Sequence, residues 1–134
     1  MFLFGDSTLF RLGKGLDAAA LRQRVIAHNL ANLNTPGFKR SAVTFEETLS
    51  RAKDAAGLPL ARTHERHLRQ TAAPAAEPRV TTETDTYRRI DGNNVDIEQE
   101  MLEMVANQLR YNSYVQQVNS RFNNWRYVIN EGRR

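Results

Sequence analysis

The sequence predicts a mainly α-helical (all-α) protein in which two long helices, one at each end of the chain, pack as a coiled-coil-like hairpin. Apolar residues recur at alternating spacings of four and three between positions 96 and 130, and again between positions 8 and 34. Such a heptad pattern is typical of helices that share a packing seam. All four prolines fall in the range from Pro36 to Pro78, so we expect a largely extended or disordered middle that contains at most short strands.

The N-terminal run predicts the first of these helices. Gly13 and Gly15 each disfavour a helix by up to about 1 kcal/mol relative to alanine, so we expect the regular helix to begin at Leu16 or Asp17, with Asp17 as its N-cap. Earlier residues are expected to be helical only if another part of the protein packs on them. The seam of this run includes a single polar residue and consists of Leu9, Leu12, Leu16, Ala19, Gln23, Ile26, Leu30 and Leu33.

A turn motif, formed by Thr35, Pro36, Gly37 and Phe38, follows this helix. Proline disfavours helical geometry in the residue before it, and glycine readily takes the positive φ that the third position of a type II turn requires. The helix is therefore expected to stop here, and Phe38 to fold back against its end. Residues 1–38 make up the first segment of the chain.

The middle segment, residues 39–94, has no helical pattern. Residues 51–78 are rich in Ala, Arg, Pro and Thr and poor in large apolar side chains, so we expect disorder or an extended surface loop there. Residues 43–49 favour a short helical turn or strand. The weak alternation of residues 80–90 favours a short strand or hairpin, and Asp-Gly-Asn-Asn at residues 91–94 is typical of a turn.

The C-terminal segment, residues 95–134, predicts one long helix. Asp96 is placed to cap it, and Gln99 stands at the capping-box position. A helix of roughly 34 residues is about 50 Å long, whereas a compact domain of this chain length spans only about 30–40 Å. We therefore expect the two end segments to form one helical domain whose surface is completed by helices from other copies.

Two sets of residues are predicted to carry the packing. The helix contacts are assigned to Leu16, Ile26, Leu30, Ile97, Met101, Val115, Val118, Phe122 and Trp125. Uncharged amides occupy other sides of both helices, where a freely solvated face would usually carry charged pairs. They fit a monomeric hairpin with an atypical surface, or fraying before the turn, or contacts with another chain; on the last interpretation, the subunit contacts are Asn29, Asn32, Asn112 and Asn119.

Composition argues against several classes of function. There is no cysteine, which excludes disulfides and thiolate chemistry. The net charge of +4 is spread along the chain with no block of five Lys or Arg, so we do not expect nucleic-acid binding. No apolar run is long enough for membrane insertion, and the N-terminus lacks the features of a cleaved signal peptide. Nucleotide-binding, nucleophile and metal motifs are missing, and His64 and His67 have no further ligands nearby, so we expect neither an enzyme nor a cofactor.

Two stretches together resemble bacterial flagellar axial proteins, the family of rod and hook subunits. Residues 27–39 (Ala-His-Asn-Leu-Ala-Asn-Leu-Asn-Thr-Pro-Gly-Phe-Lys) look like the N-terminal signature of that family. Residues 91–101 (Asp-Gly-Asn-Asn-Val-Asp-Ile-Glu-Gln-Glu-Met) look like the start of the C-terminal helix in its proximal-rod members. Leu33 is a departure, since relatives frequently carry small or acidic residues there.

The resemblance implies a structural subunit of the flagellar basal-body rod that assembles by helix packing into the periplasmic drive shaft for motility. It implies export through the flagellar type III apparatus without a cleaved signal. The implied partners are other copies of the chain, adjoining rod proteins, the basal adaptor protein and export-gate components. The alternative is a soluble coiled-coil interaction module, such as a secretion adaptor or chaperone.

Overall fold

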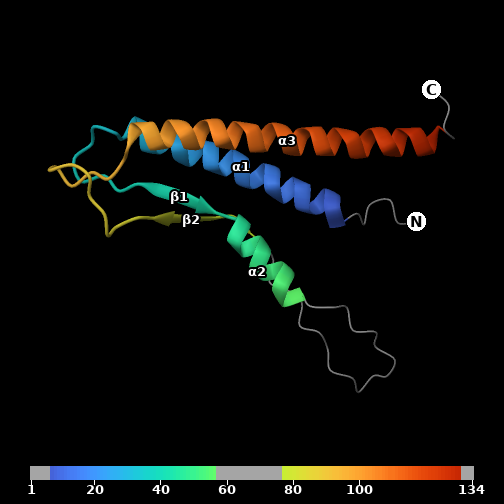
Figure 1. Ribbon diagram of the computed structural model, residues 1–134, viewed down its shortest axis with the longest axis horizontal. Coiled ribbons are helices and arrows are strands. Elements are labelled where there is room, and N and C mark those ends of the chain that lie inside the picture. The colour runs from blue at the N-terminus through green and yellow to red at the C-terminus, as the bar shows by residue number, and fades with distance from the viewer. Residues whose placement is uncertain (1–6, 57–76, 131–134) are drawn as a thin grey trace, which may run out of the picture.

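Two antiparallel helices dominate the computed structural model, which describes residues 7–56 and 77–130. Helix α1 (Ser7–Ala31) and helix α3 (Ile97–Ile129) lie side by side and run in opposite directions (Figure 1). Hydrogen bonds place Asn29 of α1 level with Glu100 of α3, and Ala19 level with Asn107. The mainly helical fold with a long helix at each end is therefore confirmed.

Helix α1 begins earlier than the sequence predicts. It is already helical at Ser7, and Asp17 lies exposed inside it, so the assignment of Asp17 as an N-cap is wrong. Gly15 is buried against α3, where a Cβ would meet the ring of Tyr114 at 3.0 Å. The glycine thus lets α3 approach closely, and this tertiary contact offsets the low helix propensity of the first turns.

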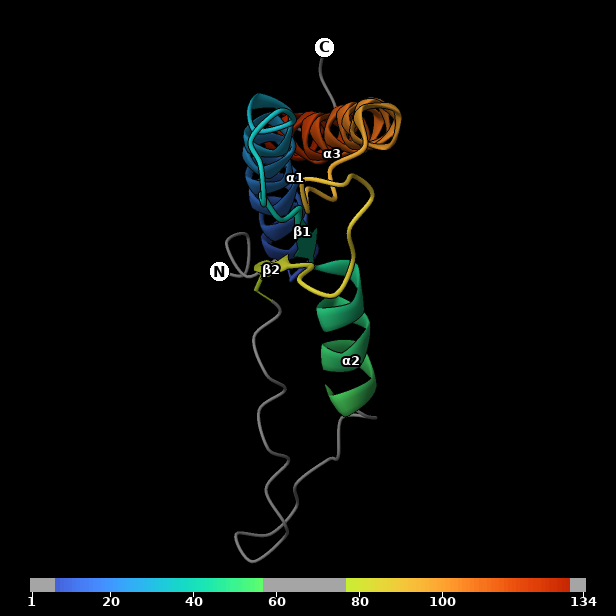
Figure 2. The ribbon, with the colours of Figure 1, turned by 90° about the vertical axis from the view of Figure 1, so that its left-hand side faces the viewer.

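A two-stranded antiparallel sheet and a third helix lie between the two long helices in the chain. Strand β1 (Ser41–Thr44) pairs antiparallel with β2 (Arg79–Thr82), with Val43 opposite Val80. Helix α2 (Glu46–Ala56) follows β1 and projects away from the α1–α3 pair (Figure 2). Residues 51–56 are helical, so the expectation of disorder or an extended loop is wrong for them. For residues 57–76 the expectation lies outside the described residues.

The apolar core lies where β1 packs on α1. Fully or nearly buried apolar residues are few, and they are Leu12, Ala18, Ala19, Ile26, Val43, Phe45 and Val95. Several polar or charged residues are as deeply buried, and they are Arg22, Asn29, Arg40, Asn93, Asn94, Glu100 and Asn107. The interior therefore relies on polar pairing as much as on apolar contact.

Candidate assembly site

The turn after α1 and the start of α3 meet at a junction that Asn93 holds together. Its Nδ2 donates to the carbonyl oxygens of Asn32 (3.1 Å), Leu33 (3.1 Å) and Thr35 (2.9 Å), and its Oδ1 accepts from the backbone N–H of Val95 at 2.7 Å. These three carbonyls belong to the turn that directly follows α1, which ends at Ala31. The fully buried Asn93 therefore fixes this turn to the start of α3.

The turn motif packs against the same junction. Gly37 has φ +72°, as the sequence predicts, and its N–H donates to the carbonyl of Asp91 at 2.9 Å. Gly92 has φ +81°, and a Cβ there would lie 3.8 Å from the Cα of Gly37. Phe38 folds back so that its ring contacts the ring of His28, with centroids 5.4 Å apart. Thr35 and Pro36 are exposed at the tip of the turn.

Asn94 connects the start of α3 to both strands through hydrogen bonds. Its Oδ1 accepts from the backbone N–H of Arg40 at 2.6 Å, at the start of β1. Its Nδ2 donates to the carbonyl of Glu83 (2.8 Å) and to Thr86 Oγ1 (2.9 Å), just after β2. The consecutive asparagines 93 and 94 thus tie α1, both strands and α3 together at a single point.

A buried charge cluster lies beside this junction. Glu100 is completely buried and accepts from Arg40 Nε (2.5 Å) and Asn29 Nδ2 (3.1 Å). Arg40 also pairs with Glu83 at 2.6 Å and with Glu103 at 3.6 Å. Burial by itself lowers the pKa of Arg40, but the hydrogen bonds and charges of Glu100 and Glu83 outweigh burial, so its pKa is raised. The guanidinium therefore stays charged inside the fold, and it links α3 to β1.

A second ion pair joins α1 to the start of α2. The buried Arg22 donates from Nη2 to both carboxylate oxygens of Glu46, at 2.9 and 2.7 Å, and to the carbonyl of Val43 at 3.4 Å. Burial raises the pKa of Glu46, but its backbone hydrogen bond and the nearby Arg22 lower it by more, so the pKa lies below its usual value.

The four amides assigned to subunit contacts lie in different environments. Asn29 is fully buried, and its amide also exchanges hydrogen bonds with the backbone of Ser41 (2.8 and 3.1 Å), so it is occupied within the chain and does not face a neighbour. Asn32 is half-buried and donates to the carbonyl of His28 at 2.8 Å. Asn112 and Asn119 are exposed on α3. The assignment to a subunit interface stays a prediction for Asn32, Asn112 and Asn119.

The predicted packing residues also divide. Ile26 is buried, while a second group is half-buried in the chain, consisting of Leu16, Leu30, Val115, Val118 and Trp125. Ile97, Met101 and Phe122 are 45–50% exposed. The inward positions of the first turns of α3 are Glu100 and Asn107 instead, so in this part of the helix the apolar seam is turned away from α1.

An apolar strip therefore lies on the outside of α3. Ile97, Met101, Val105 and Leu109 follow one another at intervals of four and are 50, 47, 58 and 64% exposed, respectively. Residues four apart lie on one face of a helix. We call these four residues the outer strip; nothing in the described part of the chain covers it.

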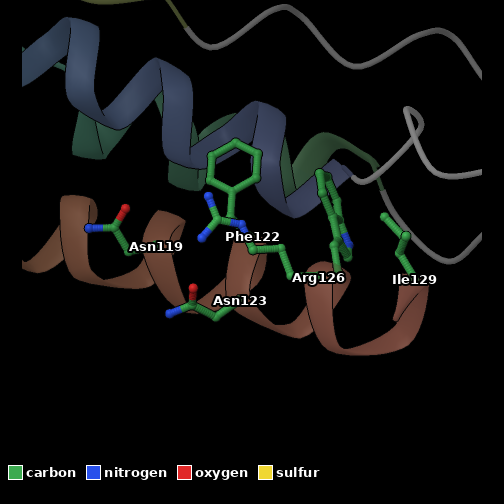
Figure 3. A pocket seen from close by; sticks show the side chains of 6 residues that line it. Asn119, Phe122, Asn123, Arg126 and Ile129 are labelled. Atoms are coloured by element: carbon green, nitrogen blue, oxygen red, sulfur yellow. The ribbon is translucent and has the colours of Figure 1, made fainter. Parts of the chain in front are cut away.

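The C-terminal end of α3 carries a second apolar surface. A depression of about 430 Å³ is lined by Asn119, Phe122, Asn123, Trp125, Arg126 and Ile129. Figure 3 shows Phe122 and Ile129 rising on the same side of the helix. The rings of Phe122 and Trp125 meet edge to face, with centroids 5.5 Å apart.

Two kinds of feature are missing from the described residues. Among them, no group of three or more His, Asp or Glu could hold a metal ion. None of the described helices is long and apolar enough to cross a membrane.

Sequence reasoning missed the residues that hold the junction, namely Arg40, Asn93, Asn94, Glu100 and Asn107. The two asparagines were interpreted only as part of a turn, and Glu100 was given no packing role. A partial signal was available in Glu100 and Asn107, two polar residues seven positions apart within the predicted C-terminal helix, which is the spacing of one helix face.

Comparison with known proteins identifies the chain's relatives. A family model described as flagella basal body rod protein matches residues 12–39. The flagellar basal body rod protein FlgB of Bacillus subtilis is 32% identical over 133 residues, which cover 99% of this chain and 100% of the relative. The FlgB protein of Borrelia hermsii is 40% identical over 105 residues (74% of this chain, 78% of the relative), and that of Aeromonas hydrophila is 35% identical over 108 residues (79% and 80%).

Proposed function

The chain belongs to the FlgB family of flagellar basal body rod proteins, and we propose that it acts as a structural subunit of the proximal rod by packing its helices against neighbouring subunits. The rod is part of the basal body, so the chain is located there. It has no reactive step to perform, and its task is to hold its neighbours in place and to pass torque between them.

The outer strip is the observation that carries the assembly mechanism. Fully burying an aliphatic side chain stabilises a protein by about 1.5–3 kcal/mol relative to leaving it exposed. The four residues of the strip are about half exposed, so covering them with a neighbouring helix gains roughly half of that amount for each. Exposed apolar surface arranged along one helix face marks a protein contact.

The junction gives such contacts a fixed geometry. Asn93 and Asn94 hold α1, the strands and α3 at one end, and the ion pair of Arg40 with Glu100 ties β1 to α3. A force applied to α3 is thus passed to α1 and to the two strands through several directional hydrogen bonds and ion pairs. This rigidity is what a torque-bearing subunit needs.

We infer the finer points of partners and location from the family and from the sequence. The neighbours are other copies of the chain, the adjoining rod proteins, and the adaptor and export-gate components at the base of the rod. The chain occupies the periplasmic rod and is exported without a cleaved signal. Asn112 and Asn119, which are exposed on α3, are the amides that we assign to subunit contacts.

A clean deletion in the parent organism tests the proposal. We expect non-swimming cells whose envelopes, viewed by electron microscopy, contain the membrane rings of the basal body but no rod. A plasmid copy of this gene restores both features, and an empty plasmid is the control. Normal swimming and intact basal bodies in the deletion strain would overturn the proposal.

A further inference from the structure

The α1–α3 pair has one covered side and one open side. Arg22 and Ile26 of α1 line the side that β1 covers, together with Arg40. Ala20 and Arg24 lie two residues from Arg22, and positions two apart in a helix point in nearly opposite directions. On their side the pair forms a groove of about 400 Å³, lined by Ala19, Ala20, Arg24, Asn107, Gln108 and Tyr111.

The groove contains a polar atom whose bonding is incomplete. Asn107 is buried, and its Nδ2 donates to the carbonyl of Ala19 (3.0 Å) and to Gln23 Oε1 (3.1 Å). Its Oδ1 is buried and has no hydrogen-bond donor among the residues that the structure describes. A buried acceptor without a donor costs about 1–3 kcal/mol, so Asn107 is incompletely satisfied within the described part of the chain.

The outer strip of a second copy is a candidate occupant of this groove. Its side chains are apolar and regularly spaced, and the groove wall contributed by α1 has the small residues Ala19 and Ala20, which let a helix approach closely. Asn112 lies three residues beyond Leu109 on the same face of α3 and is exposed.

Charge also favours a second copy. Arg24 on the groove has no ion pair with any described residue, and the same is true of the Glu98 carboxylate, one position after Ile97 at the start of the strip. Opposite charges on the two surfaces favour the pairing of strip with groove and disfavour groove with groove.

We propose that the outer strip of α3 in one copy packs into the α1–α3 groove of the next copy, a contact that rests on the proposed rod function. The strip and the groove consist of different residues, and they adjoin on α3, where Gln108 Nε2 of the groove donates to Asn112 Oδ1 at 3.3 Å. The strip–groove contact is heterologous and head-to-tail, and it generates an open helical array instead of a closed dimer.

Disulfide cross-linking tests this contact, and the chain has no cysteine of its own to interfere. Ala20→Cys marks the groove and Val105→Cys marks the strip. Both changes are introduced together into the gene in the parent organism, basal bodies are purified and oxidised, and the products are separated by non-reducing gel electrophoresis. The expected result is a ladder of bands at multiples of 15.3 kDa.

The controls separate this inference from the function itself. Each single-cysteine variant should stay monomeric, and so should Val105→Cys combined with Thr84→Cys, which lies exposed after β2. A dimer from either single variant would indicate a two-fold contact and would overturn the proposal. The proposal also fails if the double variant forms cross-links only to a protein of another mass. A second pair, Ala20→Cys with Leu109→Cys, keeps the test valid if the first pair fails to assemble.

If swimming cells contain the variant in their basal bodies and neither pair cross-links, the strip–groove contact is refuted while the rod function stands. If the wild-type chain is missing from purified basal bodies, the rod function itself fails.

Discussion

Replacing Arg40 by methionine isolates the contribution of the buried charge cluster. Methionine keeps much of the length and apolar character of the arginine stem but removes its charge and donors. Glu100, which is completely buried, is then left with a single side-chain donor, Asn29 Nδ2 at 3.1 Å. The variant therefore carries a buried carboxylate without a counter-charge.

The expected loss of stability is large. Removing one partner of a buried ion pair typically costs about 3–5 kcal/mol, because the remaining charge stays desolvated. Small domains are stable by only about 5–15 kcal/mol in total. We therefore expect Arg40→Met to lower the free energy of unfolding by about 3–5 kcal/mol, which leaves a marginally folded chain.

The double variant Arg40→Met with Glu100→Gln provides the matched control. It removes the charge that the single variant leaves behind, while the amide oxygen of glutamine can still accept from Asn29. We expect it to regain much of the loss, because replacing both members of a buried pair is far less costly than removing one.

Urea titration of the purified chains, followed by far-UV circular dichroism, measures both effects by linear extrapolation. A loss below about 1 kcal/mol in Arg40→Met would show that the pair behaves as a surface ion pair. A double variant no more stable than the single one would show that the loss comes from packing and not from the stranded charge. Either result would refute the reasoning.

Three further predictions concern other parts of the chain. Gly15→Val should destabilise the fold by about 1–3 kcal/mol because the new side chain would clash with the ring of Tyr114. Gly13→Ala should stabilise it by up to about 1 kcal/mol, because a Cβ at this position has no neighbour within 4 Å. Thermal melts of both variants measure these effects. Val118→Asp, which places a charge on the half-buried side of α3, should abolish swimming on soft agar, and normal motility would contradict the packing role. The pKa of Glu46 is lower in the folded chain than its usual value of 4.5, so its pairing with Arg22 stabilises the fold above pH 4.5. This stabilisation is lost as the pH falls through the pKa of the folded chain. Unfolding titrations below pH 4.5 should therefore show a shallower loss of stability in Glu46→Gln than in the wild type.

The parts of the fold that the sequence predicts are those that local chemistry determines. Two heptad patterns predict two long helices, and the hydrogen bonds that Asp96 Oδ1 accepts from the N–H groups of Glu98 and Gln99 confirm the cap of the second helix. Gly37 adopts positive φ as expected, because this requirement depends only on its own backbone.

The parts that the sequence could not predict depend on contacts between distant residues. The start of α1 was placed too late because the benefit of Gly15 comes from Tyr114, about a hundred positions along the chain. The inward face of α3 was misassigned because the heptad analysis follows apolar residues, whereas Glu100 and Asn107 point inward. Their burial is favourable only because Arg40, Asn29 and the carbonyl of Ala19 are positioned to pair with them, which no local pattern reveals.

This inversion of polarity along α3 has a consequence for assembly. Directional bonds at Asn93, Asn94 and Glu100 specify one arrangement of the helices within the subunit, because an unpaired buried group would penalise any other. The apolar residues that a monomeric protein would use for its core are left on the outside, at Ile97 and Leu109 among others. A subunit built in this way obtains its shape from polar contacts inside and much of its final stability from its neighbours. We therefore expect substitutions at the junction to impair folding before assembly, and substitutions in the outer strip to impair assembly while the isolated chain still folds.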